Sequence, residues 1–178
     1  MDKKALILSG SPGKNGNSDI LCDEFLRGAV DGGNWVEKIR IAEKNIGFCR
    51  GCCACQDTGA CVLHDGMDEL SRKMSTADII VLASPISYFA ISAPLKTLLE
   101  RTFAFEKDVQ NKQFYYIVSA ADKDIVDEQI AIACFRGYAG CLKYAQEMGI
   151  PYAMGVYKAG EVRNTEALIQ AYAMGRNV

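Results

Sequence analysis

The chain has 178 residues, of which 49% are apolar and 24% charged, so it can bury a substantial core, and we expect one domain over residues 1–178. Twenty basic and 22 acidic residues give a net charge of -2, which argues against nucleic acid or an anionic membrane as a partner. No signal peptide and no apolar run of the roughly 20 residues that span a bilayer is recognised, so the sequence predicts a cytoplasmic protein whose eight cysteines are thiols, metal ligands or redox centres.

Apolar runs and helical patterns alternate along the chain. The sequence predicts strands over residues 4–8, 35–41, 77–83, 113–119 and 151–157. It predicts helices over residues 20–32, 67–75, 91–105, 125–148 and 165–174. Polar residues alternate with apolar ones in the 35–41 strand, which is typical of a strand at or near an edge. This order predicts an α/β fold, in which helices cover both faces of a doubly wound, five-stranded parallel sheet.

The loop over residues 9–18 reads Ser-Gly-Ser-Pro-Gly-Lys-Asn-Gly-Asn-Ser and joins a strand to a helix. Its glycines allow a sharp turn, and its hydroxyls, amides and cation precede a helix N-terminus, which suits a phosphate. The candidate residues are Ser11, Lys14, Asn17 and Ser18. The spacing matches neither the phosphate loop of nucleotide hydrolases nor Gly-x-Gly-x-x-Gly, so we predict a single phosphate. The alternative is an ordinary turn capped by Ser or Asn.

Two further loops, over residues 84–91 and 119–124, also follow predicted strands. Ligands bind beyond the carboxyl ends of parallel strands, so we expect all three loops to line one site. The second loop offers apolar and aromatic surface to a flat ring, and its candidate residues are Pro85, Ile86, Ser87 and Tyr88. The alternative for Tyr88 and Phe89 is plain packing. In the third loop Ala121 permits close approach of a ligand, and Asp122 is an acceptor for a ring N–H or a cap for the next helix.

These residues resemble those of a known family. Residues 10–18 look like the FMN phosphate loop of the flavodoxin-like NAD(P)H-dependent FMN reductases, and residues 84–101 resemble their isoalloxazine loop and the helix that follows. The resemblance implies FMN as cofactor, NAD(P)H as electron donor, and a homo-oligomer in which a neighbouring subunit completes the flavin site. It implies that the phosphate is held by Ser11, Asn17 and Ser18. It also implies that Pro85, Ile86, Ser87 and Tyr88 face the ribityl chain and flavin, with Ala121 and Asp122 near the pyrimidine edge. Gly13 and Ser87 depart from the family pattern, in which arginine and tyrosine are common at these positions.

Between the second strand and the next helix lies a cysteine-rich segment over residues 45–65. Its spacing, Cys-x2-Cys-x2-Cys-x5-Cys, allows thiolates to converge on a 4Fe-4S cluster, and it resembles the motif of iron-sulfur flavoproteins. The candidate ligands are Cys49, Cys52, Cys55 and Cys61, with Cys53 spare. The alternatives are a zinc site, a disulfide or free thiols. His64 is interpreted as a plain loop histidine, and Cys22, Cys134 and Cys141 as small core residues.

Together these features predict an FMN-dependent oxidoreductase. It would take electrons from NAD(P)H and pass them to a flavin, quinone or protein acceptor, with the cysteine-rich segment as a candidate 4Fe-4S site. A single histidine and the lack of paired carboxylates argue against a hydrolytic site. The alternatives are a non-catalytic FMN and iron-sulfur electron carrier between protein partners, and a zinc-stabilised binding module that has lost FMN. The modest net charge favours the reductase over a carrier, because carriers of this kind are usually strongly acidic.

Overall fold

The structure is a computed structural model that describes residues 2–178, the side chains of residues 125–128 excepted. The strands are β1 (Lys4–Ser9), β2 (Trp35–Arg40), β3 (Ile79–Ser87), β4 (Ala90–Ile91), β5 (Gln113–Ser119), β6 (Gln146–Gly149) and β7 (Tyr152–Ala153). The α-helices are α1 (Asn17–Asp31), α2 (Ala54–Thr58), α3 (Met67–Thr76), α4 (Ala93–Arg101), α5 (Ile125–Gly140) and α6 (Glu166–Arg176). Short 3-10 helices are η1 (Ile41–Glu43), η2 (Thr102–Asp108) and η3 (Glu161–Asn164). Within the described residues, no helix has both the length and the apolar character needed to cross a membrane.

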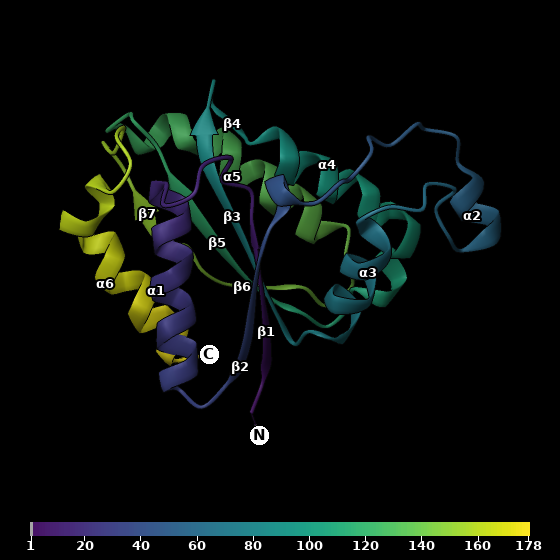
Figure 1. Cartoon of the computed structure of the whole chain (residues 1–178), viewed down its shortest axis with the longest axis horizontal. Helices are drawn as coiled ribbons and strands as arrows, with labels where there is room; N and C mark the ends of the chain where they lie inside the picture. The colour runs from purple at the N-terminus through teal and green to yellow at the C-terminus, as the bar shows by residue number, and fades with distance from the viewer. Residues whose placement is uncertain (1) are drawn as a thin grey trace.

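The sheet has the order β2-β1-β3-β5-β6, and all of these neighbours pair in parallel (Figure 1). β7 pairs with the end of β5, and β4 turns back antiparallel on β3. This is the doubly wound order 2-1-3-4-5 of flavodoxin-like sheets, in which ligands bind at the switch beside the first strand. The predicted fold class is confirmed, and β2 lies at an edge as its alternating pattern predicted.

Both faces of the sheet are covered by helices, which explains the continuous apolar runs in its central strands. Side chains alternate across a strand, so Ala5 and Ile7 pack against α1 and α6 on one face. Leu6 and Leu8 pack on the other face in the core shared with α3, α4 and α5. Figure 1 shows α1 and α6 side by side on the first face, while α2 lies on an arm that projects from the opposite side of the molecule.

The prediction of one helix over residues 125–148 is wrong. α5 ends at Gly140, and after a turn in which Tyr144 has a positive φ of 60° the chain enters β6. Gln146 donates its N–H to the carbonyl of Lys112, which starts the pairing with β5. Cys141 consequently lies outside the helix and is exposed, contrary to its interpretation as a core residue, whereas Cys22 is fully buried and Cys134 half-buried. The last predicted strand is shortened to Tyr152–Ala153.

Burial of Cys22 makes stability sensitive to alkaline pH. Desolvation, partly offset by the charge of Lys38, raises the pKa of this thiol to about 12, whereas an exposed thiol ionises near pH 9. The folded protein therefore keeps a proton that the unfolded chain releases above pH 9, so stability falls as pH rises from 9 toward 12. We expect Cys22→Ala to reduce the pH slope of the unfolding free energy in this window by up to about 1.4 kcal/mol per pH unit.

Urea unfolding of wild type and Cys22→Ala at pH 7, 9 and 10.5 measures this slope. Cys141→Ala is the matched control, because it removes an exposed thiol and is expected to keep the wild-type slope. Equal slopes for wild type and Cys22→Ala would contradict the prediction.

Candidate functional site

The three predicted loops meet at the carboxyl edge of the sheet, because β1, β3 and β5 are parallel neighbours: Ser9 at the end of β1 pairs with Ala83, and Ser119 at the end of β5 pairs with Pro85. Gly10 donates its N–H to the carbonyl of Ala83 at 2.8 Å, which joins the first loop to β3 just before the second loop begins. The hydroxyls of Ser18 and Ser119 are 2.7 Å apart and buried, which joins the first helix to the end of β5. These two contacts bring together residues that are far apart in sequence and form one continuous edge.

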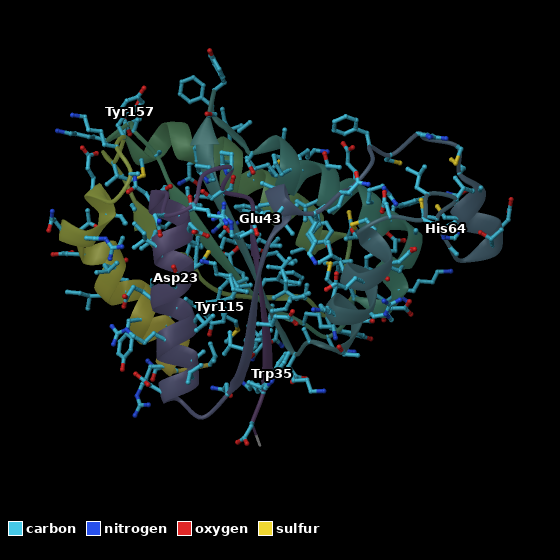
Figure 2. The ribbon with its side chains drawn as sticks, viewed as in Figure 1. Asp23, Trp35, Glu43, His64, Tyr115 and Tyr157 are labelled. Carbon is cyan, nitrogen blue, oxygen red and sulfur yellow. The ribbon has the colours of Figure 1, made fainter. Side chains whose placement is uncertain are left out.

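The first loop leads directly into the amino end of α1. Its N-cap residue, Gly16, has no side chain, so no cap bond occupies the first N–H groups of the helix, those of Asn17 and Ser18 among them, and an anion can bind them. Ser11 is buried and its hydroxyl donates to the carbonyl of Gly13 at 3.0 Å. Lys14 is largely exposed and lies 3.3 Å from the carboxylate of Glu43. Figure 2 shows Glu43 near this end of the sheet and Trp35 at the opposite end.

The side chain of Asn17 does not point its amide toward a ligand. Its Nδ2 donates to the carbonyls of Val156 and Lys158, and its Oδ1 accepts the N–H groups of Gly160 and Val162 at 3.1 and 3.2 Å. All four partners lie in the segment before α6. These bonds engage the Asn17 side chain and tie residues 156–162 to the start of α1, so the group that Asn17 can offer to a phosphate is its backbone N–H.

A buried charge network behind the first loop was missed by the sequence analysis. Asp19, in the first turn of α1, lies 3.0 Å from Lys38 Nζ and 2.8 Å from Arg40 Nη1, and it accepts the N–H of Asn15. Arg40 also donates to the carbonyl of Gly13 at 3.3 Å. Burial disfavours the charge of Asp19, but the two cations outweigh it and hold its pKa below the usual value. Alternation in β2 marked Lys38 and Arg40 as polar, but nothing in the sequence indicated their partner.

The second loop is a hairpin rather than a simple strand end. β3 continues through Pro85 and Ile86 to Ser87 and pairs with β4, so the predicted end of this strand at residue 83 is wrong. Tyr88 and Phe89 form the turn, both with positive φ, and Tyr88 is 99% exposed. Because Tyr88 has almost no contact with the rest of this chain, the plain-packing alternative does not apply to it. Pro85 and Ile86 are half-buried at the predicted ring edge.

The third loop leaves Ala121 and Asp122 exposed beside the end of β5. Asp122 Oδ1 accepts the N–H of Asp124 at 3.0 Å, just before α5 begins, and the Asp122 carbonyl accepts the N–H of Gly155. The carboxylate therefore stabilises the turn that precedes α5.

The candidate cluster residues lie on an arm that we call the cysteine loop, residues 48–62. One cavity of about 90 Å³ is lined by Cys49, Cys52, Cys53, Cys55 and Cys61, together with Val62, Leu63 and Phe103. All of these cysteines are free thiols. Among the described residues, no three His, Cys, Asp or Glu side chains are close enough to form a site for a single metal ion. His64 is exposed beside Asp68, as expected of a plain loop histidine.

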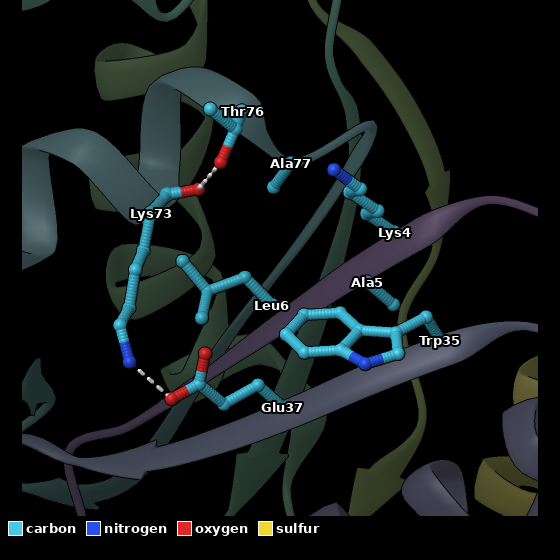
Figure 3. A pocket seen from close by; sticks show the side chains of 8 residues that line it. All are labelled: Lys4, Ala5, Leu6, Trp35, Glu37, Lys73, Thr76 and Ala77. Atoms are coloured by element: carbon cyan, nitrogen blue, oxygen red, sulfur yellow. Dashed lines mark hydrogen bonds and ion pairs between the residues drawn. The ribbon is translucent and has the colours of Figure 1, made fainter.

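The residues at the sheet edge fit a phosphate ester of a flat ring. A Cβ at Gly10 would lie 2.5 Å from Ser92 Oγ, and one at Gly16 would lie 2.9 Å from Ser11 Oγ, so a side chain at either position would fill the cradle. The donor set of the cysteine loop fits an iron-sulfur cluster, which is held by thiolates. A further cavity of about 330 Å³, lined by Trp35, Leu6 and the ion-paired Lys73 and Glu37, lies at the amino ends of β1 and β2 and is not part of this site (Figure 3).

Comparison with known sequences identifies relatives. A family model described as NADPH-dependent FMN reductase matches residues 3–132. An iron-sulfur flavoprotein of Archaeoglobus fulgidus is 39% identical over 102 residues, which are 57% of this chain and 46% of that protein. An iron-sulfur flavoprotein of Methanocaldococcus jannaschii is 38% identical over 99 residues, covering 56% of this chain and 51% of that protein. The chain thus spans about half the length of the curated relatives it matches.

Comparison with solved structures supports the same fold. The NAD(P)H:quinone oxidoreductase from Methanothermobacter marburgensis has a TM-score of 0.75 at 16% identity and covers 99% of this chain and 97% of its own. At such identity the likeness shows the fold alone. The family model, in contrast, covers most of the chain, including the phosphate loop, the cysteine loop and the hairpin. The chain therefore belongs to the NADPH-dependent FMN reductase family.

Proposed function

We propose that this chain is one FMN-binding unit that takes electrons from NAD(P)H and passes them to a flavin, quinone or protein acceptor. The observation that carries the proposal is the joining of three loops at one sheet edge by the Gly10–Ala83 and Ser18–Ser119 hydrogen bonds. This arrangement offers an anion site at a helix N-terminus beside an apolar edge, as a phosphate ester of a flat ring requires. Family membership supports FMN as that ester.

The chain's own residues bind and orient the cofactor, which when bound supplies the hydride chemistry. The N–H groups of Asn17 and Ser18, with the Ser11 hydroxyl and the Lys14 cation, would hold the phosphate. Arg40 and Lys38 neutralise the buried negative charge of Asp19. Without these two cations, that charge would repel a phosphate at this end of the helix. The residues that would contact the ribityl chain and ring are Pro85, Ile86, Ser87, Tyr88, Ala121 and Asp122.

We also propose that Cys49, Cys52, Cys55 and Cys61 hold a 4Fe-4S cluster. The four thiols line one cavity. The relatives that carry the name iron-sulfur flavoprotein match this chain over about half of their own length. Glycine supports the sharp turn at this site, since Gly51 has a φ of 62°. The exposed ring of Tyr88 and the exposed Phe48 favour a homo-oligomer that covers them.

Purification without oxygen, followed by a visible spectrum, iron and sulfide analysis, and stopped-flow mixing with NADH or NADPH, tests both proposals. We expect one FMN and about four iron atoms per chain. We expect bleaching of the bound flavin by reduced nicotinamide well above the rate of free FMN. Replacing all four proposed cysteine ligands by serine is expected to remove the iron and leave FMN bound.

The outcomes separate the candidate functions. A flavin that is bound but reduced no faster than free FMN would favour the electron carrier over the reductase. Colourless protein that takes up no FMN on titration would overturn both the reductase and the electron carrier. FMN binding without iron would contradict the cluster and leave the thiol interpretations.

A further inference from the structure

The cysteine loop is closed at its base by one buried ion pair that we call the neck, formed by Asp65 and Arg101. Arg101 Nη1 lies 2.7 Å from Asp65 Oδ2, and its side chain is 1% exposed. The same guanidinium donates to the carbonyl of Gly47 at 2.6 Å and to that of Leu63 at 3.3 Å. Asp65 accepts the N–H groups of Gly47 and Met67 at 2.9 and 3.0 Å. One ion pair thus binds the backbone on both sides of the loop.

Beyond the neck the loop packs against the rest of the described chain mainly where α2 approaches η2. None of the residues of α2 is buried, and although α2 approaches η2, cavities of about 240 and 460 Å³ lie between the loop and the α3 and η2 elements. All four proposed cluster ligands lie between Gly47 and Leu63 in sequence. Fixing the two ends of a loop removes much of its freedom, so the neck sets where these thiols can go.

Cys61 is coupled to the neck through its neighbour. Leu63 donates its N–H to Cys61 Sγ at 3.5 Å, while its carbonyl accepts from Arg101. Burying a guanidinium costs desolvation free energy, and replacing a buried ion pair by apolar residues often leaves stability unchanged. A contribution to stability alone therefore does not account for the ion pair of Asp65 and Arg101. The fork geometry of the guanidinium suits the task of binding two carbonyls and a carboxylate at once.

The helix α4 connects the neck to the candidate flavin site. Its first turn follows Ser92 beside Gly10, and its last residue is Arg101. Nine residues at 1.5 Å per residue give a strut about 14 Å long. The neck therefore fixes the cysteine loop to the same rigid element that borders the flavin edge.

We propose that Asp65 and Arg101 are positioning residues, which close the neck of the cysteine loop and hold Cys61 in place so that the loop is shaped before metal binds. The role given to these two residues rests on the proposed 4Fe-4S site. The structural content of the proposal, a loop held by one ion pair, is tested without metal.

The metal-free test is limited trypsin digestion of the full chain with FMN added. Arg50 is the only Lys or Arg within residues 48–62, so cleavage there reports opening of the loop. We expect Asp65→Asn and Arg101→Lys to be cut at Arg50 about tenfold faster than wild type. Arg101→Lys keeps the positive charge but loses the planar guanidinium that donates to several acceptors at once. Glu100→Gln, which removes an exposed ion pair with Lys96 on the same helix, is the control and is expected to match wild type.

The second readout is iron retained after anaerobic reconstitution and gel filtration, with circular dichroism and FMN binding as checks on folding. We expect Asp65→Asn and Arg101→Lys to retain at least about fourfold less iron than wild type and Glu100→Gln. If both neck variants are cleaved at Arg50 at the wild-type rate and retain as much iron as wild type, the positioning role of the neck is overturned and the cluster proposal stands. If wild type binds no iron, the cluster proposal fails, and the trypsin comparison alone decides the neck.

Discussion

Replacing Gly175 by alanine is expected to lower the free energy of unfolding by about 3 kcal/mol. Gly175 in α6 lies against α1, where an added Cβ would stand 2.1 Å from the carbonyl oxygen of Phe25 and 3.0 Å from the nitrogen of Ala29. Gly28 makes the reciprocal approach, with its Cβ position 2.1 Å from the carbonyl oxygen of Tyr172. The obstructing atoms are helix backbone, so no side chain can rotate to make room, and the two helices must separate.

The matched control is Gly137→Ala. Gly137 is also helical, in α5, but a Cβ there meets nothing within 4 Å. Alanine favours a helix over glycine, so this variant is expected to gain about 0.5–1 kcal/mol. Urea unfolding without added FMN measures both, because a bound cofactor would add its own contribution to stability. If Gly175→Ala were as stable as wild type, that result would contradict the close packing of α1 against α6 at Gly175.

This contact matters for the site because α1 begins at the phosphate loop. α6 fixes the carboxyl half of α1 through Gly28 and Gly175, and Asn17 ties its amino end to residues 156–162. A variant that loosens α6 is therefore expected to disturb the site from a distance. FMN titration of Gly175→Ala measures that coupling.

The sheet was predictable from the sequence because its central strands are covered on both faces. Apolar runs of the right length gave β1 within one residue and β5 at both ends. β6 was not predictable, because Gln146, Glu147 and Met148 favour a helix and are exposed in the strand. Their conformation depends on backbone pairing with β5, a tertiary effect that overrides local preference.

The site was predictable in its location but not in its internal contacts. Parallel strands bring their carboxyl ends to one edge, so the meeting of the three loops followed from the strand assignment. The partners of Asn17 lie about 140 residues away, and those of Arg101 lie 36 to 54 residues away. A single sequence carries no signal for such pairs. The buried Asp19 and Arg101 and the half-buried Asp65 were overlooked for a related reason, because charged residues are usually exposed.

Replacing Gly10 by alanine is expected to weaken FMN binding by about 100-fold, a loss of about 2.7 kcal/mol. Gly10 is the point at which the phosphate loop touches both β3 and the first turn of α4. An added Cβ would stand 2.5 Å from Ser92 Oγ, 2.7 Å from Leu95 Cβ and 3.1 Å from the carbonyl oxygen of Ala83. Relief requires the phosphate loop to move away from the hairpin, and a cofactor that spans both would lose a preformed site.

Gly13→Ala separates this effect from a general loss of loop flexibility. Gly13 belongs to the same loop, but a Cβ there meets nothing within 4 Å, so FMN affinity is expected to stay within about threefold of wild type. Fluorescence titration of FMN, with circular dichroism to confirm folding, measures both variants. Equal affinities for Gly10→Ala and Gly13→Ala would mean that FMN does not depend on the contact between the two loops.

A second substitution tests whether the contact itself is the cause. Ser92 Oγ is buried and has no hydrogen-bond partner in the described structure, so Ser92→Ala removes the atom nearest to the added methyl at little cost. We expect Gly10→Ala/Ser92→Ala to recover part of the lost FMN affinity, while Leu95 Cβ prevents full recovery. Additive losses in the double variant would show that the two residues act independently. Recovery would instead support the view that the spacing between the phosphate loop and α4 sets the affinity for the cofactor, since the double variant differs from Gly10→Ala only in lacking the Ser92 hydroxyl that the added methyl would meet.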